Sequence, residues 1–129
     1  MSKKAKKDFA YHLSRFLSIY LPDQRNVSEN TVLSYKDTFK LILMFAKEEK
    51  KLLSNQLSIS DLTRSFFEKF LLWLKSSRKC SVSTCNQRLG AIRSFFTYLQ
   101  YEMPEAAMLC QEVLSIRTAK APEGQLNYL

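Results

Sequence analysis

Apolar residues recur along this chain at steps of three and four, the spacing that places side chains on one face of an α-helix. Four long segments follow the pattern, at about 8–20, 29–50, 64–77 and 82–101, and a shorter fifth covers about 105–114. The pattern predicts an all-α fold of four main helices and a short fifth helix. The apolar stripe of the first segment consists of Phe9, Leu13, Phe16, Leu17 and Tyr20.

Residues that begin or end helices stand at the borders of these segments. The hydroxyls of Ser28 and Thr63 can cap the second and third helices. Asp8 suits the start of the first, because a carboxylate is attracted to a helix N-terminus. Pro22 and Pro104 end the first and fourth segments, since proline cannot continue a helix.

The two ends of the chain differ from its helical middle. Residues 1–7 are mostly basic and are expected to form a flexible tail. Residues 116–129 have the composition of a linker, and 125–129 look like the start of a further segment. The helical domain is therefore expected to cover residues 8–115.

The charge of the chain is positive and unevenly distributed. Its 20 Lys and Arg against 12 Asp and Glu give a formal net charge of +8, which favours a polyanionic partner. No acidic residue occurs from Lys69 to Tyr101, as expected of a surface that meets phosphates, although a solvated surface explains the net charge equally well. The basic residues of this window are Lys69, Lys75, Arg78, Lys79, Arg88 and Arg93.

Composition argues against several other classes of protein. With 46% hydrophobic residues the chain can form a packed core, and two Gly and three Pro are too few for the turns of a β-sandwich or barrel. The three cysteines form no CxxC pair and the single His lies far from them, so no zinc site and no cofactor are expected. No stretch approaches the about 20 apolar residues of a membrane span. The expected location is cytoplasmic and nucleoid-associated, with reduced thiols.

The fourth segment, capped by Ser81 or Ser83, has a face of small and polar residues opposite its apolar stripe. A helix that enters a DNA groove needs such a face, because small side chains permit close approach and flanking Arg88 and Arg93 can hold phosphates. The alternative is a plain polar face with a glycine used for helix packing. The residues of this face are Ser83, Gln87, Gly90, Ala91 and Ser94.

The start of the second segment is another candidate contact. Backbone N–H groups at a helix N-terminus attract phosphate, and the hydroxyls of Thr31, Ser34 and Tyr35 can add hydrogen bonds. The alternative is an ordinary Ser28 cap with the Tyr35 ring in the core.

Apolar residues on the outer face of the same segment suggest a different function. Leu33, Leu41 and Met44 are too apolar for a purely solvated face. They motivate the alternative of a helical protein–protein interaction module that makes no direct contact with DNA.

Two runs of the sequence resemble tyrosine recombinases and phage-type integrases. Residues 16–21 and 26–35, followed by Phe39 and Phe45, are similar to the opening of these proteins, and 81–99 is similar to the fourth helix of their core-binding domain. The resemblance extends from about Phe9 to Leu129. It implies a SAM-like orthogonal bundle of two crossed helical hairpins, in which the second and fourth helices face duplex DNA.

The resemblance also implies contact residues. By position, Thr31, Ser34 and Tyr35 match the family's contacts on the second helix. Ser83, Thr84, Gln87 and Arg88 match those on the fourth helix. The charge pattern and the open helix face add the remaining expected DNA-binding residues, Lys79, Gly90, Arg93 and Ser94.

The chemistry of the family is expected to lie outside this chain. The resemblance implies a parent recombinase that assembles as a tetramer on DNA, with a catalytic domain beyond Leu129 that supplies the tyrosine nucleophile. The fragment itself is not expected to be an enzyme. His12 and Arg15 spell the family's His-x-x-Arg motif only by coincidence, because they lie in the first helix, at the wrong end of the family's order.

Overall fold

The structure, a computed structural model, describes residues 2–24, 26–53 and 55–118 and contains helices but no strands in that part of the chain. The prediction of an all-α fold is confirmed. The elements in chain order are α1 (Ser2–Arg15), η1 (Phe16–Tyr20), α2 (Glu29–Lys50), η2 (Ile59–Asp61), α3 (Arg64–Ser76), α4 (Val82–Glu102), η3 (Pro104–Ala106) and α5 (Ala107–Leu114).

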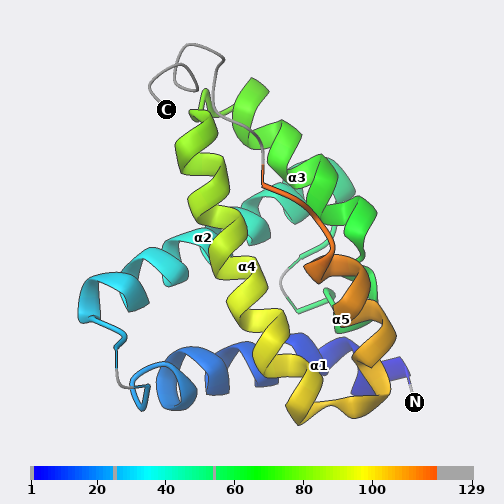
Figure 1. Cartoon of the computed structure of the whole chain (residues 1–129). Helices are drawn as coiled ribbons and strands as arrows, with labels where there is room; N and C mark the ends of the chain where they lie inside the picture. The colour runs from blue at the N-terminus through cyan, green and yellow to red at the C-terminus, as the bar shows by residue number, and fades with distance from the viewer. Residues whose placement is uncertain (1, 25, 54, 119–129) are drawn as a thin grey trace.

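The helices form two hairpins that cross each other, with α1 and α2 in one and α3 and α4 in the other (Figure 1). α4 lies across the front of α1 and α2 in this view, and it also packs against α3 and α5. One side of α4 is therefore left for solvent or a partner. None of the helices described is both long and apolar enough to cross a membrane.

Side-chain caps explain where α2, α3 and α4 begin. α2 begins after Ser28, whose Oγ accepts the N–H of Thr31 at 3.1 Å, and it ends at Lys50 as the pattern predicts. Thr63 caps α3 in the same way. Of the two serines considered for α4, Ser81 is the cap.

The first helical segment ends at Tyr20 as predicted, but it begins earlier than predicted and its last turn is of a different type. It begins at Ser2, so 2–7, expected as a flexible tail, is helical; lysine and alanine, which fill most of this stretch, favour a helix. Asp8 therefore lies inside α1 and does not cap it. Its Oδ1 accepts the backbone N–H of Ile59 at 2.9 Å and so caps η2 instead. The last turn, η1, is a π-helix.

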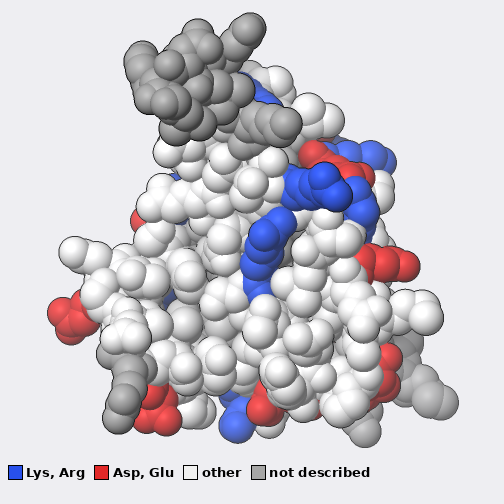
Figure 2. Space-filling view, in the orientation of Figure 1, with Lys and Arg blue, Asp and Glu red and all other residues white. Residues whose placement is uncertain are grey.

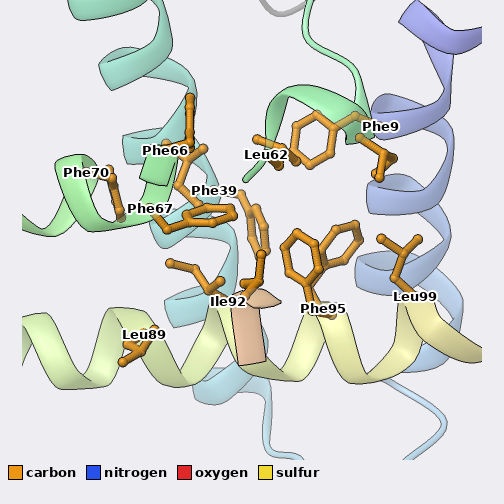
Figure 3. Packing of buried hydrophobic residues seen from close by; sticks show 14 of the residues in the cluster. Phe9, Phe39, Leu62, Phe66, Phe67, Phe70, Leu89, Ile92, Phe95 and Leu99 are labelled. Atoms are coloured by element: carbon orange, nitrogen blue, oxygen red, sulfur yellow. The ribbon is translucent and has the colours of Figure 1, made fainter. Parts of the chain in front are cut away.

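Aromatic side chains build the core where the hairpins cross. Phe9, Phe39 and Phe95 meet between α1, α2 and α4 (Figure 3), and the ring centroids of Phe39 and Phe95 lie 5.4 Å apart. A second aromatic cluster joins α2 to α3. Burial of each such ring stabilises the fold by about 1.5–3 kcal/mol. The second cluster consists of Phe45, Phe66, Phe70 and Trp73.

A wider arc of α4 is buried than the spacing of its apolar residues predicts. Most of the predicted stripe is buried, but so are Phe95, Tyr98 and Ala91. The placement of Ala91 on the open face is wrong, since only 1% of its surface is exposed. The physical reason is that α4 packs against helices on several sides, so the open face is narrower than helical periodicity predicts.

Candidate nucleic-acid interface

An uncharged stripe of exposed residues runs along α4, at alternating steps of four and three. Three of the five residues predicted for the open face are exposed, Ser94 is half-buried and Ala91 is buried. The stripe continues to Thr97 and to Tyr101, which is 77% exposed. Neither residue is among those predicted from the sequence, although their spacing places both on the same face. The α4 stripe consists of Ser83, Gln87, Gly90, Ser94, Thr97 and Tyr101.

Gly90 has no role in packing within the described residues. A Cβ added to it would meet no atom within 4 Å, so the alternative of a helix-packing glycine has no support. Glycine in a helix interior costs about 1 kcal/mol relative to alanine. The α4 stripe thus contains a position where the backbone is open to close approach from outside the domain.

Two helix starts share one capping arrangement. The Ser28 and Thr31 hydroxyls lie 3.1 Å apart at the start of α2, and Ser81 Oγ donates to Thr84 Oγ1 at the same distance at the start of α4. The predicted contact residues Thr31 and Thr84 therefore already use their hydroxyls locally. The first turns they stabilise carry the positive end of the helix dipole, which favours an anion.

Arg88 connects the two predicted contact regions. Its Nη1 donates to the backbone carbonyl of Ser34 at 3.3 Å and to Thr38 Oγ1 at 3.1 Å. The structure thus brings Ser34 of α2 and Arg88 of α4 together. The guanidinium is turned toward α2, and its Nε is buried with no hydrogen-bond partner among the described residues.

The other flanking residues have different surroundings. Arg93 donates to the backbone carbonyl of Ile116, so it holds the segment that follows α5. The Tyr35 ring is half-buried and stacks on Phe16, with centroids 6.3 Å apart. Lys79 is exposed just before α4 and has a left-handed backbone with φ of 58°, which is uncommon for a residue other than glycine.

The basic residues of the acid-free window do not gather on the α4 stripe. Figure 2 shows that the face with α4 in front is mostly uncharged, and that Lys and Arg atoms gather over α3 and the segment after α5. Contact with DNA by the predicted residues stays a prediction. The α4 stripe is thus an uncharged surface, and the basic surface over α3 and the segment after α5 is separate from it.

The cysteines show no sign of a reactive or metal site. Cys85 and Cys110 are buried, and burial raises the pKa of both thiols, that of Cys110 to about 11. A buried neutral thiol is a poor nucleophile. Among the residues described, no three His, Cys, Asp or Glu side chains are placed to hold a metal ion.

Comparison with known proteins assigns the family. Residues 13–102 match the family model of the phage integrase N-terminal SAM-like domain. The chain is 33% identical over 117 residues to a Sinorhizobium fredii protein named integrase/recombinase y4rC, over 91% of the chain and 35% of that relative. It is 36% identical over 88 residues to the tyrosine recombinase XerC of Herpetosiphon aurantiacus, over 68% of the chain and 26% of that relative.

These matches carry the assignment without help from known folds, since no solved structure matches the chain. The chain spans about a third of the length of the Sinorhizobium relative and less of the XerC protein. The match to the family model extends from the last residues of α1 to the end of α4 and so includes α2, α3 and the α4 stripe. The chain belongs to the phage integrase family, as an N-terminal SAM-like domain of the tyrosine recombinase type.

Proposed function

We propose that this domain binds duplex DNA through the α4 stripe and the first turns of α2 and α4. The observation that carries the proposal is the open surface at Gly90, within a stripe of uncharged side chains. The major groove of B-DNA, about 12 Å wide, admits an α-helix. Gly90 lets the backbone of α4 approach the groove closely, and Gln87 on the same stripe can hydrogen-bond to a base edge.

Phosphate contacts would come from the ends and flanks of this surface. The first turns of α2 and α4 offer backbone N–H groups to phosphate oxygens, and Lys79 stands beside the start of α4. Such contacts position a protein on DNA without reading its sequence. We therefore expect the lone domain to bind many duplexes, with modest sequence preference.

The strand chemistry is assigned to another part of a longer protein. The relatives named recombinases are about two and a half times as long as this chain, and this chain matches the model of an N-terminal SAM-like domain. We propose that the domain holds DNA while a separate catalytic domain of the parent cuts and rejoins strands for integration and recombination.

Binding of the 129-residue chain to a labelled duplex, followed by fluorescence anisotropy over a series of salt concentrations, tests the proposal. The logarithm of the affinity should fall linearly with the logarithm of salt concentration. Gln87→Ala should alter the ranking of different duplex sequences. The matched control is Gln111→Ala, an exposed glutamine on α5 outside the α4 stripe, which should leave that ranking unchanged. Absence of duplex binding at low salt contradicts the proposal.

A second candidate function is self-association of the parent protein. Leu33 is 56% exposed and Met44 is 38% exposed on the outer face of α2, while Leu41 is half-buried. Apolar side chains of this size on one face favour contact with a second copy, and the parent is proposed to act as a tetramer on DNA. Sedimentation of the chain with and without duplex separates this function from DNA binding. A monomer under both conditions contradicts self-association of the domain.

A further inference from the structure

A basic groove lies between α3 and the segment that follows α5, apart from the α4 stripe. It has a volume of about 730 Å³, and its charged lining consists of Arg64, Glu68, Lys75 and Arg117. Figure 2 shows that basic side chains gather over these elements. Three cations against one carboxylate leave the groove with a net positive charge.

Arg64 fixes one wall of the groove. Its Nε pairs with Glu68 Oε2 at 3.0 Å, and its Nη1 donates to Ser115 Oγ at 2.8 Å. Ser115 Oγ also donates to the carbonyl of Glu112. The segment after α5 is thereby tied to α3.

Arg93 fixes the same segment from the other side. It donates from α4 to the carbonyl of Ile116, whose side chain is buried and whose N–H donates to the carbonyl of Val113 at 3.1 Å. Two arginines on different helices therefore hold residues 115 and 116. Arg117 comes next in the chain and lines the groove together with Lys75.

The basic groove has the positive charge that the α4 stripe lacks. The α4 stripe is uncharged, yet DNA binding of any kind depends largely on phosphate neutralisation. Arg88 and Arg93, the basic residues that flank the stripe, donate hydrogen bonds within the domain. Lys75 and Arg117 are exposed and make no ion pair among the described residues.

We propose that this groove binds the phosphate backbone of the duplex that the α4 stripe contacts, with Lys75 and Arg117 as the binding cations. Arg64 and Arg93 act as positioning residues, because they hold the backbone that presents Arg117. The site carries no base recognition and adds affinity for any duplex. The inference rests on the proposed function and assigns it a second, electrostatic contact.

The test compares two double variants that remove the same charge. The first variant, Lys75→Ala with Arg117→Ala, removes the two proposed phosphate-binding side chains from the groove. The second, Lys40→Ala with Lys47→Ala, removes two exposed lysines from α2. Binding of the 129-residue chain to a labelled duplex is measured by fluorescence anisotropy over a salt series. Circular dichroism checks that both variants keep the fold, as their exposed positions lead us to expect.

In a plot of the logarithm of affinity against the logarithm of salt concentration, the groove variant should show a less steep decline. The slope should become less negative by about 0.9 for each phosphate that the variant no longer neutralises. The α2 variant should leave this slope close to that of the unmodified chain. Equal slopes in the two variants overturn the groove while leaving the α4 proposal intact. If the unmodified chain binds no duplex, the proposed function and the groove both fail.

Discussion

Arg88 on α4 donates a hydrogen bond from Nη1 to Thr38 Oγ1 on α2 at 3.1 Å, across 50 positions of sequence. Thr38 is buried and donates its own hydroxyl to the carbonyl of Ser34 at 3.1 Å. Because α2 and α4 carry the two candidate contact regions, this side-chain network helps to set the geometry of the whole candidate interface.

Thr38→Val keeps the branched shape of the side chain and removes one of the two acceptors of Arg88, together with the hydroxyl that donates to Ser34. The free energy of unfolding should fall by about 1.5–3 kcal/mol, the range for hydrogen bonds to charged groups. Urea denaturation measures it. Thr97→Val, at an exposed position on the α4 stripe, is the control and should change stability little. Equal decreases in the two variants would mean that the Arg88 hydrogen bond contributes nothing of its own.

Asp8→Ala should destabilise the fold by about 1 kcal/mol, the typical cost of removing a side-chain cap. The reason is that Asp8 Oδ1 accepts the N–H of Ile59 and joins α1 to η2. Thermal denaturation of Asp8→Ala beside Asp37→Ala, an exposed aspartate on α2, isolates this hydrogen bond from a general change in charge. Asp8→Asn keeps an acceptor oxygen and should be destabilised less than Asp8→Ala. Equal destabilisation by Asn and Ala contradicts the hydrogen bond.

The helices could be predicted because their signals are local. The Ser28 cap and the N–H that it binds lie three residues apart, so the start of α2 follows from a short stretch of sequence. Asp8 has the same capping chemistry, but its partner is 51 positions away. No local pattern distinguishes a carboxylate that caps its own helix from one that caps another.

In the candidate interface, too, features set by local spacing could be predicted, whereas contacts with distant residues could not. Gly90 and Gln87 were found from helical spacing, and the structure leaves both exposed. The surroundings of Arg88 and Arg93 could not be predicted, because their acceptors lie on α2 and after α5. Ala91 was misplaced for a related reason, since the width of the open face depends on how neighbouring helices pack on α4.

Gly90→Ala should move stability and DNA affinity in opposite directions. Alanine in the helix interior should raise the free energy of unfolding by about 1 kcal/mol, because its Cβ meets no neighbour. The same Cβ stands where the proposal places DNA, so affinity for duplex should fall, and fall further in Gly90→Leu. Urea denaturation and duplex titration measure the two effects. A more stable variant that binds DNA as well as the unmodified chain contradicts close approach at Gly90.

Cys110 should make the fold sensitive to alkaline pH. Its side chain is fully buried, and burial raises the pKa of the thiol from an ordinary value of 9.0 to about 11. Folding therefore favours the protonated thiol. This contribution to stability is fully present below about pH 9, where the unfolded thiol is also protonated, and is lost as pH rises toward 11.

The measurement is the free energy of unfolding of the unmodified chain and of Cys110→Ala between pH 7 and 11. The variant should be less stable at pH 7, because the buried sulfur no longer fills its place in the core. Its stability should decline less steeply above pH 9, since the thiol that titrates only in the unfolded chain is gone. Every other ionisable side chain is present in both proteins, so the difference between the two curves isolates Cys110. Parallel curves above pH 9 would show that the Cys110 thiol ionises in the folded state as easily as in the unfolded one.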